Sequence, residues 1–159
     1  MKHLIRIAAL AMIAGFGSTV TAPAQETEDP FADVVETRHG LMFQMAADLG
    51  TLGGMAKGDM AYDSAAAAKA ASNIAAIASV ISMAQFPEGS EFGKAKDSFA
   101  LPAIWTNQED FLVKIAALNT AAAALQVSAA VDVEGIKAGM KDLGGACSAC
   151  HKDYRQKEE

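Results

Sequence analysis

Three residues near the C-terminus have the types and spacing for covalent cofactor chemistry: Cys147, Cys150 and His151. Residues three and four apart on a helix are neighbours, so the two thiols and the imidazole would project from one face. Two such thiols can add to the two vinyl groups of a haem, and the imidazole then lies under the ring. C-x-x-C-H is the attachment sequence of c-type haem. The spacing therefore predicts one haem c, held by two thioether bonds, with His151 as an axial iron ligand.

Other uses of the cysteine pair fit the sequence less well. A disulfide between Cys147 and Cys150 would close a very small loop and would stabilise the fold little. A zinc site would need a fourth ligand beyond the three clustered residues, and none is evident. A thioredoxin-like redox pair accompanies a βαβ pattern, which the sequence lacks.

The N-terminal segment has the pattern of a secretory signal. Lys2 and Arg6 supply a positive start, an uncharged and largely apolar run covers 7–16, and APA at 22–24 is an A-x-A cleavage site. The apolar run is too short to span a bilayer. We therefore predict a cleaved signal peptide over 1–24 and a periplasmic protein. Covalent haem attachment also requires export, because it takes place outside the cytoplasm.

The mature chain has the size of one domain and an acidic charge. Removing 24 residues from 159 leaves 135, which is one domain's worth. Without Lys2 and Arg6, 11 of the 13 basic residues remain against 19 acidic residues, a formal charge of −8. This charge disfavours nucleic acid and anionic membranes, and it permits a basic partner protein. Asp, Lys and Asn interrupt the later alanine-rich stretches, so no membrane span is expected in the mature chain.

Apolar residues recur with helical spacing in four segments, which follow a mobile leader at 25–30. The expected helices run from Phe31 to a stop at Gly58, from Asp63 or Ser64 to about Ala84, from a capping box at 106–109 through Leu125, and from Asp132 to Tyr154. Between the second and third helices, residues 86–105 contain two prolines and two glycines and form a crossing loop. No segment alternates like a strand over a useful length. The economical architecture for 31–159 is an all-α, antiparallel four-helix bundle, with the haem near the C-terminal end of the last helix.

The predicted core is rich in small side chains. Alanine runs such as Ala65–Ala68 and Ala121–Ala124 favour helix but bury little area per residue. A bulky apolar group that the sequence does not supply would fill the space between such helices. Gly144 and Gly145 cost about 1 kcal/mol each relative to Ala inside a helix. They predict either close approach of a flat ring or a neighbouring helix, or a break in the last helix.

Haem attachment on the last helix resembles the class II cytochromes c, whose best-known members, the cytochromes c′, are four-helix bundles. The resemblance covers 31–157 and rests on RHGLM at 38–42, FPEGS at 86–90, LPAIW at 101–105 and CSACHKDYR at 147–155. The first stretch is similar to the family's Arg-Gln-x-x-(Met or Leu) motif. The next two are similar to its crossover segment, and the last is similar to its C-terminal signature.

The resemblance implies a role for each residue of the attachment motif. Cys147 and Cys150 hold the haem, and His151 is its proximal ligand. Arg155 lies near the proximal haem face. The spacing alone leaves Arg155 open as a solvated charge near the C-terminus.

On the first helix, the resemblance places Arg38 near the haem propionates and Met42 on the distal side. His39 stands where the family usually has Gln, and a hydrogen bond to a propionate is its corresponding role. The residues themselves leave two interpretations of Arg38 open. A guanidinium inside an apolar stripe needs an anion, or else its head reaches water from the edge of the stripe. Ala100 and Leu101 are candidates to contact the haem edge.

Met42 divides the functional prediction in two. If its sulfur ligates iron, His/Met ligation gives a six-coordinate electron carrier with a raised reduction potential. If it only packs over the iron, a five-coordinate metal is open to NO or CO, in a pocket lined by Met42 and by Phe43 or Phe86. A peroxidase-like enzyme would need a distal acid–base pair, for which His39 is the sole distal histidine candidate. We favour electron transfer and expect no enzyme activity.

The expected partners follow from these functions. An electron carrier needs a periplasmic redox partner protein, and the five-coordinate alternative binds NO or CO. Class II proteins are often homodimers through their first two helices, and alanine-rich outer faces would permit such a contact here.

Overall fold

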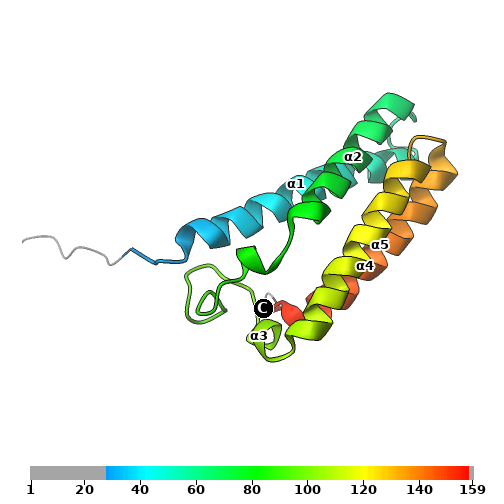
Figure 1. Ribbon diagram of the computed structural model, residues 1–159. Helices are drawn as coiled ribbons and strands as arrows, with labels where there is room; N and C mark the ends of the chain where they lie inside the picture. The colour runs from blue at the N-terminus through cyan, green and yellow to red at the C-terminus, as the bar shows by residue number, and fades with distance from the viewer. Residues whose placement is uncertain (1–27, 158–159) are drawn as a thin grey trace, which may run out of the picture.

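The computed structural model describes residues 28–157, which form a helical domain (Figure 1). Its elements are α1 (Ala32–Lys57), α2 (Ser64–Val80), the 3₁₀ helix η1 (Met83–Gln85), α3 (Ala103–Thr106), α4 (Gln108–Ser128) and α5 (Val133–Tyr154). The predicted signal peptide at 1–24 and the first part of the predicted leader at 25–30 lie outside the described residues.

The four long helices of the described chain form a bundle. α1 and α2 make one antiparallel pair, α4 and α5 make the other, and residues 81–102 cross between the pairs (Figure 1). α1 packs against α2, α2 against α4, α4 against α5, and α5 against α1, so the helices surround one interior. The predicted all-α, antiparallel four-helix bundle is confirmed.

Three helix boundaries form as predicted. Gly58 ends α1 with a left-handed φ of 80°, which glycine adopts without a Cβ clash. Asp63 begins α2, and its side chain accepts a hydrogen bond from the Ala66 N–H at 2.9 Å. Asp132 begins α5 in the same way and accepts from the Gly135 N–H at 2.7 Å. Short polar side chains at these positions satisfy N–H groups that have no partner inside the helix.

Two other predicted boundaries are wrong. α2 ends at Val80 rather than near Ala84, because Ser82 starts η1 with a capping box of its own. The capping box predicted at 106–109 does not form. Asn107 instead ends the short helix α3 and begins α4 at once, and its side chain makes no capping hydrogen bond.

The core contains many small residues, as predicted. Five alanines on or next to α2 and α4 are fully buried: Ala67, Ala71, Ala78, Ala122 and Ala129. The largest fully buried side chains in the same cluster are Leu52, Ile74, Leu125, Ile136 and Leu143. This combination lets the helices pack closely around a few branched side chains.

The glycines of α5 differ in their surroundings. A Cβ at Gly139 would lie 2.7 Å from Leu125 Cδ1 and 2.9 Å from Ser128 Oγ, so Gly139 lets α4 and α5 approach closely. No protein atom outside the local helix lies within 4 Å of the same position at Gly144 or Gly145. α5 also continues through both residues. The predicted break is therefore wrong, and close approach of a neighbouring helix does not explain these two glycines.

The composition of α4 bears on the expectation that the mature chain has no membrane span. Among the described helices, α4 is long and apolar enough to cross a membrane, judged by length and composition alone. Its alanines and branched residues outnumber its few charges. The core helix of a bundle passes the same test, and α4 packs against α2 and α5, so the absence of a membrane span stays a prediction.

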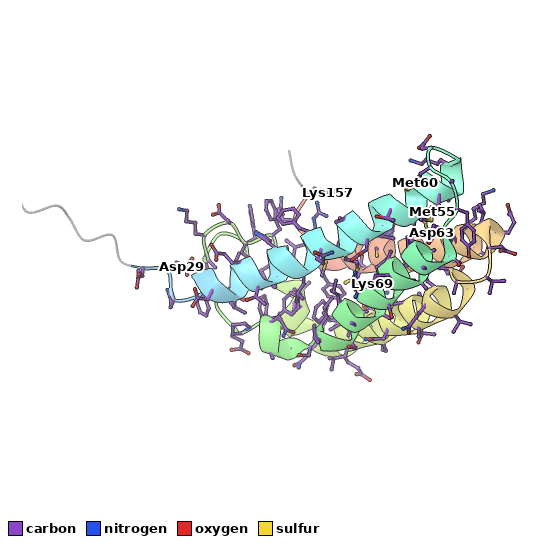
Figure 2. All side chains as sticks on the ribbon, turned by 90° about the horizontal axis from the view of Figure 1, so that it is seen from above. Asp29, Met55, Met60, Asp63, Lys69 and Lys157 are labelled. Atoms are coloured by element: carbon purple, nitrogen blue, oxygen red, sulfur yellow. The ribbon has the colours of Figure 1, made fainter. Side chains whose placement is uncertain are left out.

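The two ends of the bundle are built differently. Figure 2 shows Met60 and Asp63 at the turn between α1 and α2, with Asp29 toward the opposite end of α1. The crossing segment, α3 and the end of α5 gather at that opposite end (Figure 1). The predicted site residues lie on the segments that meet there.

Candidate haem site

The end of the bundle that holds the crossing segment contains a cavity of about 290 Å³. Ligand pockets typically start at about 300 Å³, so this cavity is near the lower end of that range. Its walls come from α1, the crossing segment, α3, α4 and α5. Most of the lining residues are apolar, including Ile81, Phe86, Ile104, Phe111, Ile115 and Leu118. The cavity therefore suits a flat apolar group with few polar contacts.

The C-x-x-C-H turn lies on the α5 wall of this cavity. Cys147, Cys150 and His151 all line it, as expected for residues three and four apart on one helix. Both cysteines are half-buried free thiols, and His151 is exposed toward the cavity. The structure thus brings the three predicted attachment residues together at one wall.

The surroundings of these groups favour their neutral forms near pH 7. Burial raises the pKa of Cys147, and it raises the pKa of Cys150 to about 11, with Cys147 as the next cause. Partial burial of the imidazole lowers the pKa of His151, and the positive charge of Arg155 lowers it further. A neutral imidazole is the form that binds a metal ion.

Arg38 lies buried at the cavity wall, with 7% of its surface exposed. Its guanidinium donates to Ser90 Oγ and Ser90 O, both at 3.1 Å, and to Ser98 Oγ at 3.2 Å. It also stands 5.1 Å from the centroid of the Phe86 ring. Burial lowers the Arg38 pKa. Because the head is buried, the interpretation that it reaches water is wrong. All its hydrogen-bond partners in the described chain are neutral oxygens.

His39 and Met42 line the cavity from α1. Both residues are half-buried. The His39 ring lies 6.2 Å from the Phe43 ring and 6.2 Å from the Phe99 ring, measured between centroids. Phe43 is 73% exposed and also belongs to the lining. The structure therefore places the predicted distal residues at the same cavity as His151, on a different helix.

The crossing segment holds the end of α5. Arg155 and Ala100 form an antiparallel bridge, and both line the cavity. The Leu101 N–H donates to Tyr154 O at 3.0 Å, and the Gln156 N–H donates to Phe99 O at 2.8 Å. Of the two residues predicted at the haem edge, Ala100 lines the cavity, whereas Leu101 serves the backbone contact.

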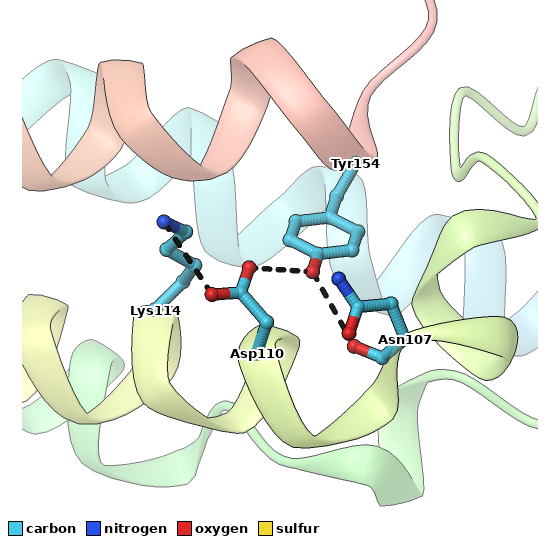
Figure 3. Close-up of polar contacts among 4 residues, drawn as sticks. All are labelled: Asn107, Asp110, Lys114 and Tyr154. Carbon is cyan, nitrogen blue, oxygen red and sulfur yellow. Dashed lines mark hydrogen bonds and ion pairs between the residues drawn. The ribbon is translucent and has the colours of Figure 1, made fainter.

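A polar cluster at the start of α4 meets Tyr154 of α5 (Figure 3). The Tyr154 hydroxyl donates to Asp110 Oδ2 at 2.7 Å and approaches Asn107 O at 3.3 Å. Lys114 Nζ lies 3.7 Å from Asp110 Oδ1, and Lys114 lines the cavity. Burial raises the pKa of Tyr154 to about 12, and the hydrogen bond to Asp110 is the next cause. Sequence reasoning missed this cluster, because 47 and 44 residues separate Asn107 and Asp110 from Tyr154 along the chain.

A helical bundle that presents a C-x-x-C-H turn to an apolar cavity defines a c-type haem protein. Comparison with known families is more specific, since the model of the cytochrome c′ family matches residues 33–155. The chain therefore belongs to the cytochrome c′ family, and the predicted resemblance is confirmed.

Individual relatives agree with this assignment. A cytochrome c-554 from Cereibacter sphaeroides is 53% identical over 125 residues, which cover 79% of this chain and 82% of the relative. A solved cytochrome c′ from Rhodobacter Spheriodes is 34% identical, with a TM-score of 0.76 over 80% of this chain and 98% of that one. A nitric oxide complex of a mutant cytochrome c prime from Alcaligenes xylosoxidans is 28% identical, with a TM-score of 0.71 over 83% and 100% of the two chains. These proteins are named as cytochromes, as expected for haem proteins.

Proposed function

We propose that the chain is an exported one-electron carrier. Cys147 and Cys150 would hold one haem c through two thioether bonds, with His151 and Met42 as the two axial ligands. The observation that carries this proposal is that all four side chains line one cavity, three from α5 and one from α1. Export relies on the signal sequence at 1–24, and the electron would pass to and from a periplasmic redox partner protein.

The residues around the cavity fit a haem. The lowered pKa of His151 leaves its imidazole neutral near pH 7, which suits iron ligation. The buried Arg38 has only neutral oxygens as hydrogen-bond partners in the described chain, so a propionate carboxylate would supply the missing opposite charge. Arg155 and His39 line the cavity too, and they are proposed near the proximal face and a propionate.

When bound, haem supplies a reversible one-electron change at its iron. The chain contributes binding and orientation, because α5 fixes the attachment turn and the crossing segment fixes the end of α5. The apolar lining excludes water from the ring. Because four packed helices hold both candidate ligands, little should rearrange when the charge on the metal changes.

The visible spectrum of the purified protein tests the Met42 ligand. Ligation predicts a low-spin spectrum with a weak sulfur–iron band near the red end. Replacing Met42 with Ala should convert that spectrum to a high-spin one. A wild-type spectrum that is already high-spin would eliminate the six-coordinate electron carrier.

A five-coordinate protein that binds NO or CO is the second candidate. The apolar side chains that line the cavity together with Met42 include Phe43, Ile81 and Ile115, which donate no hydrogen bond. Such a wall would favour NO and CO over O₂. The solved relative in a nitric oxide complex supports the same alternative. An unchanged ferrous spectrum on addition of NO would rule this function out.

Two further expectations stay predictions. The first is the absence of enzyme activity. Within the described chain, His39 packs between two aromatic rings, and the other histidine is the proposed ligand His151. The second is a homodimer through α1 and α2, which sedimentation of the purified protein would test.

A further inference from the structure

The charged residues that line the cavity are all cationic in the part of the chain that the structure describes. They are Arg38, Lys114 and Arg155, and no carboxylate belongs to the lining. Arg38 and Arg155 belong to the motifs that the sequence singled out, whereas Lys114 lies on α4 outside every motif. Its side chain is 25% exposed, so Lys114 combines partial burial with access to the cavity.

Lys114 forms an ion pair with Asp110, a carboxylate that does not line the cavity. Asp110 Oδ1 lies 3.7 Å from Lys114 Nζ, one helical turn away on α4. Asp110 is held from the other side by Tyr154, whose hydroxyl donates to Oδ2 at 2.7 Å and whose surface is 3% exposed (Figure 3). The buried Tyr154 hydroxyl thus holds the Asp110 carboxylate in place. Lys114 lines the cavity and Asp110 does not.

The field of both charges reaches the attachment turn. Lys114 lines the same cavity as Cys150, and Asp110 binds the hydroxyl of Tyr154, which lies one helical turn after Cys150 on α5. A charge that acts on Cys150 also acts on a ring bonded to its sulfur, since Coulomb interactions persist over such distances in a partly buried site. A positive charge there favours the reduced iron, and a negative charge favours the oxidised iron.

We propose that Lys114 and Asp110 tune, with opposite signs, the reduction potential of the haem held by Cys147, Cys150 and His151. This inference rests on the proposed haem attachment, but it holds whether or not Met42 ligates the iron. The reaction concerned is a one-electron reduction of ferric to ferrous iron by an electrode through a mediator dye.

A charge series at Lys114 tests the proposal in the haem-loaded protein. At a fixed electrode potential, Lys114→Gln should lower the ferrous-to-ferric ratio on the order of threefold, and Lys114→Glu should lower it by a similar factor again. Threefold corresponds to about 30 mV at 59 mV per tenfold change. Lys114→Arg should leave the ratio unchanged, because it keeps the charge. Asp110→Asn should raise the ratio.

The ion pair between Lys137 and Glu134 supplies matched controls, because it lies at the start of α5, away from the cavity. Lys137→Gln and Glu134→Gln should not change the potential. Equal potentials across the Lys114 series, or shifts of the same sign at Lys114 and Asp110, would overturn the inference and leave the proposed function intact. A wild-type chain whose mass shows no added haem would overturn both.

Discussion

Arg38 shows how one buried charge organises the crossing segment. Its guanidinium bonds three oxygens from Ser90 and Ser98, which lie 52 and 60 residues away in the chain. The Ser98 hydroxyl also donates to Ser90 O at 2.6 Å. A long loop between two helix pairs is thereby fixed against α1, close to the cavity.

Replacing Arg38 with Leu should lower the free energy of unfolding of the haem-loaded protein by about 1–3 kcal/mol, because buried acceptors lose their donor. Urea denaturation measures this change. Ser98→Ala is the milder comparison, since both hydrogen bonds from Arg38 to Ser90 remain, and it should cost about 1 kcal/mol. If the guanidinium also pairs with a propionate, Arg38→Leu should cost less in a variant without haem. An equal cost in both proteins would contradict the propionate contact.

Tyr154 predicts a loss of stability at alkaline pH. Its folded-state pKa is raised to about 12, against about 10 in an unfolded chain. Between these values the unfolded chain binds fewer protons than the folded one, so stability falls as pH rises through this window. The free energy of unfolding of the wild type should therefore approach that of Tyr154→Phe between pH 10 and 12. Parallel curves for the two proteins over this range would contradict the prediction.

At the scale of the helices, two glycines of α5 allow the effect of packing to be distinguished from the effect of intrinsic helix preference. Gly139 faces Leu125 and Ser128 at close range, whereas a methyl group added at Gly144 would have no neighbour outside its own helix within 4 Å. The same substitution at the two positions therefore isolates the effect of the neighbouring helix.

Gly144→Ala should stabilise the protein by about 1 kcal/mol, because Ala is the better helix residue. Gly139→Ala should destabilise it, since overpacking typically costs about 1–3 kcal/mol and exceeds the gain in helix preference. Urea denaturation of the two variants gives both values. If Gly139→Ala instead raises the free energy of unfolding, the prediction is wrong, and α4 shifts to make room for the methyl group without a loss of stability.

Helix caps show what could be predicted from the sequence. Gly58, Asp63 and Asp132 act through groups within four residues, so their pattern is visible in the sequence. The role of Asn107 as the boundary of two helices was not predicted, because α4 starts directly where α3 ends. The thiols and His151 were predictable at the cavity wall because one helical turn places all three.

The contacts that complete the site were not predictable in the same way. Arg38 with Ser90, and Tyr154 with Asp110, join residues that are 52 and 44 positions apart. No local pattern marks Ser90 or Asp110 as a partner, because their roles depend on how the crossing segment and α4 pack. The sequence around Lys114 is typical of a surface lysine on a helix, so its position at the cavity could not be predicted from the sequence.

For the whole molecule, we expect the two ends of the bundle to differ in stability without haem. The end near the α1–α2 turn contains the buried side chains of Leu52 and Ile136 and buried alanines such as Ala67. At the other end, an apolar space of about 290 Å³ depends on a group that the chain does not supply.

A variant that cannot attach haem, Cys147→Ser with Cys150→Ser, should therefore open locally at the cavity end. Hydrogen–deuterium exchange should become at least about tenfold faster in the first half of α1, the crossing segment and the end of α5. Amides around Leu52 and Ile136 should change far less, because their packing does not involve the cavity. Uniformly faster exchange in all four helices would show instead that the bundle unfolds as one unit, and that the haem supports the alanine-rich end as much as its own.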